Sequence, residues 1–176
     1  ASPRIVWRRD IEGSTANRKI VAQPVVADGL IFALGSAWQI VAIDANTGDV
    51  VWRNDYRDGK EKRDSHAGGG IAYRGGRIYA SLGTGLALAL DARTGAEIWS
   101  RKFDVGLRGS PTADDDQVYI TTMDNQLLAL RVTDGETVWS HVAIAESAGL
   151  MGTASPAVIG DTVVAAFSSG ELFALE

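Results

Sequence analysis

The chain of 176 residues contains no cysteine, only four prolines and no excess of positive charge. Without cysteine there are no disulfides, no thiolate metal ligands and no cysteine nucleophile within these residues. The formal charge of −5 argues against nucleic-acid binding, which normally needs a basic face. No apolar run approaches the roughly 18 residues that a membrane-spanning helix needs, and the N-terminus has no signal-peptide core. With 45% hydrophobic and 22% charged residues, the composition indicates a globular protein with a substantial core.

Glycine, in contrast, is abundant, with 20 copies, and it helps to mark regularly spaced turns. Short apolar runs rich in β-branched residues lie between turn dipeptides, which are Asp28-Gly29, Gly75-Gly76, Asp115-Asp116 and Gly160-Asp161. Alternating or short apolar runs between such turns predict strands joined by tight connections. No segment carries a sustained helical stripe with caps. The sequence therefore predicts an all-β fold.

A repeated string is the most specific feature of the sequence. The string "AIDANTGDVVWR" is followed by "ALDARTGAEIWS" and by a degraded third copy, "ALRVTDGETVWS". Their tryptophans, Trp52, Trp99 and Trp139, lie 47 and 40 residues apart, and Trp7 lies 45 residues before the first. A period of this length combined with strand-like patterning is typical of β-propellers.

Each repeat divides into four strands, which in the first full copy are expected at Ala22–Val26, Leu30–Leu34, Ile40–Ala45 and Val50–Asn54. Four antiparallel strands per radial repeat form a propeller blade, with the first strand on the central channel and the fourth outside. We expect about four blades within a single domain, at approximately 20–54, 68–103, 109–142 and 154–176.

The two ends of the chain break this pattern. Ile5–Arg9 is expected to be an isolated outer strand, and Glu171–Leu175 is expected to be a third strand without a fourth. The first segment could complete the last blade within one chain, giving a four-bladed ring. It could also do so between two chains, giving an eight-bladed homodimer. Alternatively the chain is part of a longer protein, which the abrupt end at Glu176 favours.

The repeated motif is interpreted as a fastener between blades. The aspartate is expected to accept hydrogen bonds from turn amides and a threonine hydroxyl, while glycine provides positive φ in the turn. The tryptophan offers a large flat ring and an N–H donor to the neighbouring blade. The residues concerned are Asp44, Thr47, Gly48, Trp52, Asp91, Thr94, Gly95, Trp99, Gly135 and Trp139. Direct contact of these residues with a ligand is the alternative.

These residues carry a resemblance to a known family. The frame resembles the tryptophan-docking repeat of propellers that bind pyrroloquinoline quinone (PQQ). Within that group, residues 21–175 are similar to the first half of the BamB family, through "IAESAGLMGTASPAV" and "SSGELFALE" in particular. The resemblance implies part of an eight-bladed propeller about twice this length, with a lipidated cysteine upstream. It also implies a scaffold subunit, without cofactor or metal, of the outer-membrane β-barrel assembly (BAM) complex on the periplasmic face of the outer membrane.

The long loops are expected to share one face of the propeller, where binding residues concentrate. They are Ile11–Lys19, Asp55–Ala67, Asp104–Arg108 and Ala143–Met151. The resemblance implies that Val105, Leu107 and Arg108 bind BamA, the barrel-forming subunit of that complex. The acidic pair that accompanies this loop in the family is not reproduced here. Alternatively, Leu107 only covers the rim of the channel.

Two other functions were weighed against the scaffold. A PQQ-dependent dehydrogenase shares the docking repeat, but it commonly has adjacent cysteines and needs an enclosed cofactor chamber. The two histidines, His66 and His141, are too isolated to form a metal cluster. The sequence therefore indicates a protein that is not an enzyme. A platform that accepts unfolded outer-membrane protein strands at its sheet edges is the other possibility.

Overall fold

The computed structural model describes residues 2–11, 22–35, 37–57, 68–144 and 154–176. The described residues form fifteen β-strands and no α-helix, so the all-β prediction is confirmed. Among them there is accordingly no helix with the length and apolarity to cross a membrane.

The strands form four antiparallel sheets in which each strand pairs with its neighbour in sequence. The first sheet contains β1 (Val25–Ala27), β2 (Leu30–Leu34), β3 (Gln39–Asp44) and β4 (Val50–Asp55). The second contains β5 (Gly69–Arg74), β6 (Arg77–Leu82), β7 (Leu86–Asp91) and β8 (Glu97–Lys102). The third contains β9 (Leu107–Ala113), β10 (Gln117–Thr122), β11 (Gln126–Arg131) and β12 (Thr137–Val142). The fourth has three strands, β13 (Ala157–Ile159), β14 (Thr162–Ala166) and β15 (Leu172–Leu175).

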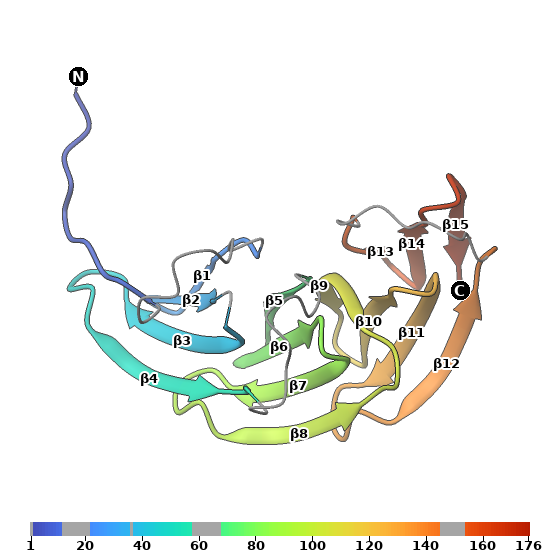
Figure 1. Ribbon diagram of the computed structural model, residues 1–176, viewed down its shortest axis with the longest axis horizontal. Helices are drawn as coiled ribbons and strands as arrows, with labels where there is room; N and C mark the ends of the chain where they lie inside the picture. Colours follow the sequence, from blue (N-terminus) through green and yellow to red (C-terminus); the bar gives the residue numbers. More distant parts are fainter. Residues whose placement is uncertain (1, 12–21, 36, 58–67, 145–153) are drawn as a thin grey trace.

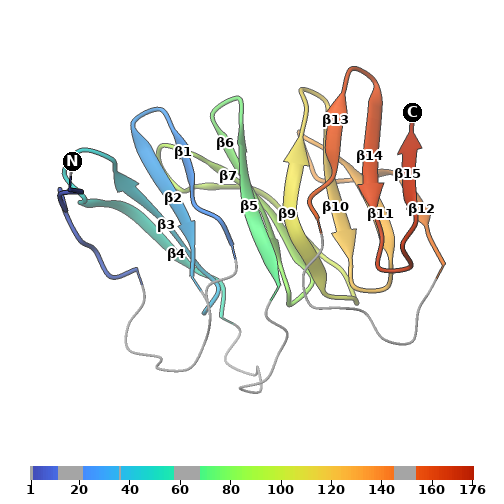
Figure 2. The same cartoon turned by 90° about the horizontal axis from the view of Figure 1, so that it is seen from above.

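The four sheets stand side by side around an open arc (Figure 1). Strands β1, β5, β9 and β13 lie on the inner side, and β4, β8 and β12 lie on the outer side. Figure 2 shows the same sheets from above, with the first at one end of the arc and the fourth at the other. This is the radial arrangement of propeller blades, and it confirms the predicted architecture. We call the four sheets blades 1 to 4.

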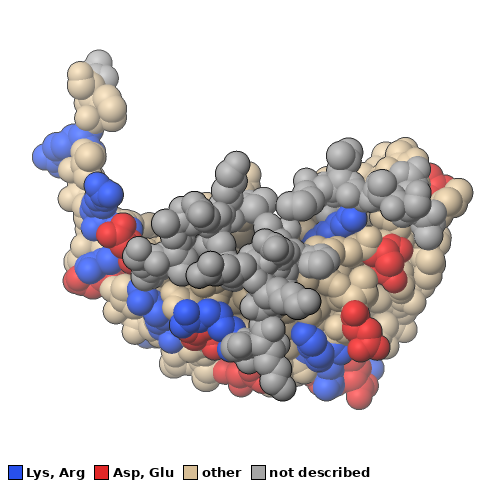
Figure 3. Space-filling view, viewed as in Figure 1, with Lys and Arg blue, Asp and Glu red and all other residues tan. Residues whose placement is uncertain are grey.

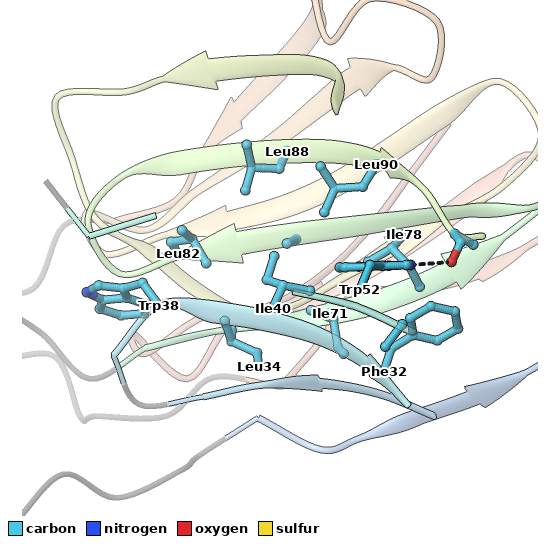
Figure 4. Close-up of a cluster of buried hydrophobic side chains, with 13 residues drawn as sticks. Phe32, Leu34, Trp38, Ile40, Trp52, Ile71, Ile78, Leu82, Leu88 and Leu90 are labelled. Atoms are coloured by element: carbon cyan, nitrogen blue, oxygen red, sulfur yellow. Dashed lines mark hydrogen bonds between the residues drawn. The ribbon is translucent and has the colours of Figure 1, made fainter. Parts of the chain in front are cut away.

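The hydrophobic core lies between the blades, in three clusters. Alternate side chains of each strand point to opposite faces of the sheet, so an interior blade is apolar on both faces. In the first cluster, Phe32 and Ile40 of blade 1 meet Ile78 and Leu90 of blade 2, all with 0% exposure (Figure 4). Similar clusters lie between blades 2 and 3 and between blades 3 and 4. Each blade is therefore stabilised mainly by its neighbours.

The inner strands of blades 2 and 3 approach each other closely because β5 begins with glycine. A Cβ atom on Gly70 would lie 2.1 Å from Ser110 Oγ of β9. On the other side of the strand, Gly69 has φ +106°, and a Cβ there would lie 2.0 Å from the carbonyl oxygen of Ser81. A side chain at Gly70 would push β5 and β9 apart, and one at Gly69 would collide with β6 of the same blade.

The N-terminal segment differs from the prediction. Ile5–Arg9 was expected to be an outer strand, but it forms no strand in the structure. An outer strand takes its hydrogen bonds from the third strand of its own blade, and no such strand is paired with this segment among the described residues. The segment lies beside blade 1, whereas β15 lies at the far end of the arc (Figure 1). Within this chain, therefore, the two ends do not close a four-bladed ring.

Candidate functional site

The motif tryptophans join each blade to the next. Trp52 Nε1 donates a hydrogen bond of 2.9 Å to the carbonyl oxygen of Ala92, and Trp99 Nε1 donates one of 3.0 Å to that of Val132. The first of these bonds is drawn in Figure 4. Trp7 makes the same contact with Ala45 at 3.0 Å although its own segment is not a strand. The acceptor always lies just after the third strand of the following blade.

Each of these indole rings lies on a glycine of the following blade. A Cβ atom on Gly48, Gly95 or Gly135 would lie 2.7, 2.6 or 2.5 Å from a ring atom of Trp7, Trp52 or Trp99, respectively. The same glycines have φ of +76°, +74° and +72°, in the left-handed region that disfavours other residues. Each position thus requires glycine for two reasons. The turn needs a positive φ, and the indole ring leaves no room for a Cβ atom.

The turn that presents each glycine is organised by a carboxylate. Asp44 accepts hydrogen bonds from the backbone N–H groups of Asn46 (2.8 Å) and Thr47 (2.9 Å), which hold its pKa below the ordinary value. Asp91 accepts from the hydroxyl and the backbone N–H of Thr94, and the pKa of Asp91 is lowered in the same way.

The third copy of the turn has the same backbone arrangement but uses an arginine in place of the motif aspartate. Arg131 replaces the aspartate, and its Nη1 donates to Asp134 (2.7 Å) and Glu136 (3.1 Å). The backbone N–H of Glu136 and the guanidinium of Arg131 together lower the pKa of Asp134. This degraded sequence still places Gly135 beneath Trp99.

A second joint residue, not evident from the sequence, lies two positions after Trp7 and two positions after Trp52. Arg9 Nε donates to the carbonyl oxygen of Gly48 at 2.7 Å, and Asn54 Nδ2 donates to that of Gly95 at 2.6 Å. At the next joint, Arg101 lines an open hollow of about 450 Å³ together with Gly135. The residue type is Arg at one joint and Asn at the other, so only the fixed distance from the tryptophan could have revealed these two residues.

Trp139 lies on β12, the outer strand of blade 3. It is half-buried, and its ring centre lies 6.0 Å from that of Tyr119 in the same blade. His141, two positions later, packs on Phe173 of blade 4 with ring centres 4.6 Å apart. Its Nε2 is buried and has no hydrogen-bond partner among the described residues.

The expected partner-binding residues fall into two environments, and one expectation is corrected. Leu107 and Arg108 do not lie in a loop, because β9 already begins at Leu107. The Leu107 side chain has 0% exposure and belongs to the core between blades 2 and 3, so it is not available to a partner in this structure. Val105 lies in the preceding turn and is half-buried.

The turn before β9 is fixed from both sides on the loop-rich face. Phe103 N–H donates to the carbonyl oxygen of Gly85 at 2.8 Å, and Met123 N–H donates to that of Gly106 at 2.8 Å. These bonds tie the connection between blades 2 and 3 to the turns beside it. The backbone that carries Val105 into Arg108 is therefore held in place before any partner arrives.

Arg108 is the unusual group on this face. It lies opposite Thr121 on β10, and therefore on the same side of β9 as Thr112, whose hydroxyl bonds Pro156 of blade 4. Its Nη1 atom is buried without a hydrogen-bond partner among the described residues. A guanidinium carries five N–H donors and a permanent charge, so an unpaired buried nitrogen is costly. The Arg108 residue as a whole is half-buried.

Other parts of the predicted loop face lie outside the described residues, including His66 and most of the loops 11–19, 55–67 and 143–151. In the part that is described, there is no group of three or more His, Asp or Glu side chains that could hold a metal ion. Charged side chains are scattered over the visible face, with both signs represented (Figure 3).

The family model for the outer membrane protein assembly factor BamB matches residues 1–64 and 39–176. The chain belongs to the BamB family. This confirms the resemblance found in the sequence. An uncharacterised protein of Rickettsia conorii is 31% identical over 92% of this chain and 39% of its own length. The outer membrane protein assembly factor BamB of Nitrosomonas eutropha is 26% identical over 91% of this chain and 37% of its own length.

A solved structure has the same fold. The crystal structure of BamB from Moraxella catarrhalis covers 91% of this chain with a TM-score of 0.74 and 21% identity. This chain covers 47% of that one, so it spans less than half the length of these BamB relatives. The propeller repeat is also shared with enzymes: quinohemoprotein alcohol dehydrogenase of Comamonas testosteroni is 32% identical over 61% of this chain and 15% of its own length.

Proposed function

We propose that this chain acts as a non-catalytic scaffold in outer-membrane protein assembly, on the periplasmic face of the outer membrane. In this proposal the loop-rich face binds BamA, the barrel-forming subunit of the machinery, and thereby joins it to the other components. Membership in the BamB family supports the assembly role. The observation that carries the contact is the buried, unpaired guanidinium nitrogen of Arg108 beside the fixed turn at Val105.

The proposed contact would give the buried Nη1 atom of Arg108 a hydrogen-bond acceptor. Arginine beside apolar side chains is favoured at protein interfaces, where its planar donors bind carboxylates in fixed geometry. Because Arg108 is half-buried on β9, it has less side-chain freedom to lose on binding than a fully exposed arginine. The partner is therefore expected to insert an acidic side chain or backbone carbonyls beside Arg108, with an apolar group against Val105.

Replacement of Arg108 tests this contact. Removing one member of a hydrogen-bonded charge pair at an interface costs about 2–5 kcal/mol, which corresponds to at least a tenfold weaker Kd. We expect Arg108→Ala to weaken the Kd for BamA by at least tenfold in a titration. Arg108→Lys is expected to retain only part of the affinity, because lysine cannot form the planar fork of donors.

Arg101→Ala is the matched control, since Arg101 is an exposed arginine of β8. We expect it to bind BamA like the unmodified chain. If Arg108→Ala keeps full affinity while its unfolding midpoint is unchanged, the proposed contact is wrong.

The non-catalytic part of the proposal has its own test. Titration of the chain with PQQ and calcium, followed by calorimetry, is expected to give no heat of binding. Saturable binding of the quinone would overturn that part and favour a dehydrogenase-like role for the propeller.

A further inference from the structure

The inner strand of blade 3 contains a bulge directly after Arg108. Arg108 pairs with Thr121 on β10, but the next pair in the register is Thr112 with Tyr119. Three residues of β9 therefore occupy the space opposite one residue of β10. The inner strands β1, β5 and β13 keep a continuous register with their neighbours. Gly109, the first residue of the bulge, has φ +59°. Because bulges redirect the side chains beside them, this one sets the direction in which Arg108 leaves the strand.

Two buried hydroxyl groups bind the backbone of this bulge. Ser81 Oγ of β6 donates a hydrogen bond of 2.6 Å to the carbonyl oxygen of Gly109, and Thr121 Oγ1 of β10 donates one of 3.3 Å to that of Arg108. Ser81 is 0% exposed and Thr121 is 3% exposed. Ser81 Oγ also accepts a hydrogen bond of 3.3 Å from the N–H of Gly70, so it links β5 to β9. Two consecutive carbonyl groups beside the Arg108 side chain are thus held from two different blades.

The two hydroxyls hold the same position in their blades. The fifth residue of the second strand is Ser81 in blade 2 and Thr121 in blade 3, but it is Leu34 in blade 1 and Ala166 in blade 4. A buried hydroxyl costs free energy unless it forms a hydrogen bond, whereas leucine or alanine fits an apolar core directly. The hydroxyls occur in the blade that carries Arg108 and in the blade before it. Their placement therefore indicates a role in holding the bulge.

We propose that Ser81 and Thr121 are positioning residues for the contact between Arg108 and BamA, an inference that rests on the proposed function. Both side chains are buried within the described chain, so neither meets the partner itself. They hold the carbonyl groups of Arg108 and Gly109, and thereby present the guanidinium in one direction before binding. Donors that are preorganised in this way lose less freedom when a partner binds. Loss of either hydroxyl is expected to release the bulge and weaken the contact.

Removal of each hydroxyl tests this role. Ser81→Ala and Thr121→Val delete the donor with little change in side-chain size. We expect each variant to weaken the Kd for BamA by about two- to tenfold, the range that corresponds to one hydrogen bond. Thr121→Ser keeps the hydroxyl and is expected to keep the affinity of the unmodified chain.

A double-mutant cycle separates positioning from general stability. On the Arg108→Ala background, Ser81→Ala is expected to weaken the Kd no further, because the group that it positions is absent. The matched control is Thr112→Val, which removes a hydroxyl of the same strand that lies outside the bulge and bonds Pro156. This control is expected to lower the unfolding midpoint but to bind BamA like the unmodified chain.

The side-chain Nε–H resonance of Arg108 gives a second readout, in the free chain and without BamA. We expect Ser81→Ala and Thr121→Val to shift this NMR resonance and to speed its exchange with water, while Thr112→Val changes neither. An unchanged resonance in both hydroxyl variants, or a loss of affinity that adds fully to that of Arg108→Ala, would overturn the positioning role. Full affinity of Arg108→Ala would instead overturn the proposed BamA contact, and the resonance would still show whether the hydroxyls hold the bulge.

Discussion

At the scale of single residues, an indole on a glycine recurs where residues 2–11 meet blade 1, between blades 1 and 2, and between blades 2 and 3. Trp99 is 6% exposed, packs among the buried residues between blades 2 and 3, and bonds the carbonyl oxygen of Val132. Removing such a large buried side chain leaves a cavity and an unpaired acceptor.

We predict that Trp99→Ala lowers the free energy of unfolding by about 3–5 kcal/mol. The control Val138→Ala, at a 47% exposed position on β12, is expected to change it by less than about 1 kcal/mol. Urea unfolding followed by circular dichroism measures both changes. Equal midpoints for Trp99→Ala and the unmodified chain would show that the indole does not fasten the blades.

A titration prediction concerns the end of β4. The guanidinium of Arg57 lowers the pKa of Asp55 from 3.8 to about 2. A lowered pKa in the folded state means that this pair stabilises the fold above about pH 4 and ceases to do so as the pH falls toward 2. Both side chains are more than one-third exposed, so solvent screening keeps the contribution to about 0.2–1 kcal/mol.

Carboxyl NMR titration checks this value directly. Arg57→Gln is expected to return the pKa of Asp55 toward 3.8, while the same substitution at Arg53, which also lies on β4, should leave it near 2. An unchanged pKa of Asp55 in Arg57→Gln would contradict the assignment.

Residue types alone could not predict every backbone conformation. Trp38 has φ +60°, in a turn where the other blades place Gly85, Asn125 and Gly170, all with positive φ. Tryptophan is not a turn signal, so this position could not be recognised from the sequence. Its ring is 4% exposed and covers one end of the core between blades 1 and 2 (Figure 4), so burial offsets the cost of the left-handed backbone.

At the scale of elements, strands with a partner were predictable and a strand without one was not. The second strand of blade 1 was expected at Leu30–Leu34 and is found there, because alternating apolar residues between turn dipeptides leave one register that buries them. Ile5–Arg9 has equally suitable residues but forms no strand, since a strand requires a neighbour to pair with. The burial of Leu107 was likewise not evident, because one side of β9 faces the core and the sequence suggested a loop.

The glycines of β5 lead to a prediction about how inner strands pack. Gly70→Val would drive its side chain into Ser110 of β9, and overpacking of this kind costs typically 1–3 kcal/mol. Ser110→Gly in addition is expected to recover part of that loss, because it removes the obstructing hydroxymethyl group. Thermal unfolding of the single and double variants measures the effect. A double variant no more stable than Gly70→Val would show that the two inner strands do not limit each other.

At the scale of the whole molecule, the blades form a row in which each contacts only its neighbours. The stability of such a row is approximately a sum of blade and joint contributions, and an end blade leaves one face unfilled. The exposed aliphatic residues Val26, Ile159 and Leu172 lie on the two end blades of the described row. The loop-rich face is different, because the buried Arg108 Nη1 atom there has no hydrogen-bond partner among the described residues.

The candidate site was only partly predictable from the sequence, because packing decides which of its side chains are buried. The resemblance to the BamB family singled out Val105, Leu107 and Arg108 together, as a run of neighbouring residues. Strand pairing in β9 sends Leu107 into the core and Arg108 to the other side, and only the folded chain shows which donor remains unpaired. The resemblance therefore suggests a region for the proposed contact, while packing decides which of its side chains are buried in the core.

The central structural claim is that one indole resting on one glycine fastens blade 1 to blade 2 and blade 2 to blade 3. It is tested most directly by a double-mutant cycle of Trp52→Ala and Gly95→Ala, with free energies from urea unfolding. Gly95→Ala incurs about 1–2 kcal/mol from its left-handed backbone in either background, but it clashes with the ring only when Trp52 is present. We predict that Gly95→Ala is less damaging on the Trp52→Ala background by about 1–3 kcal/mol. Equal costs of Gly95→Ala in both backgrounds would contradict the account.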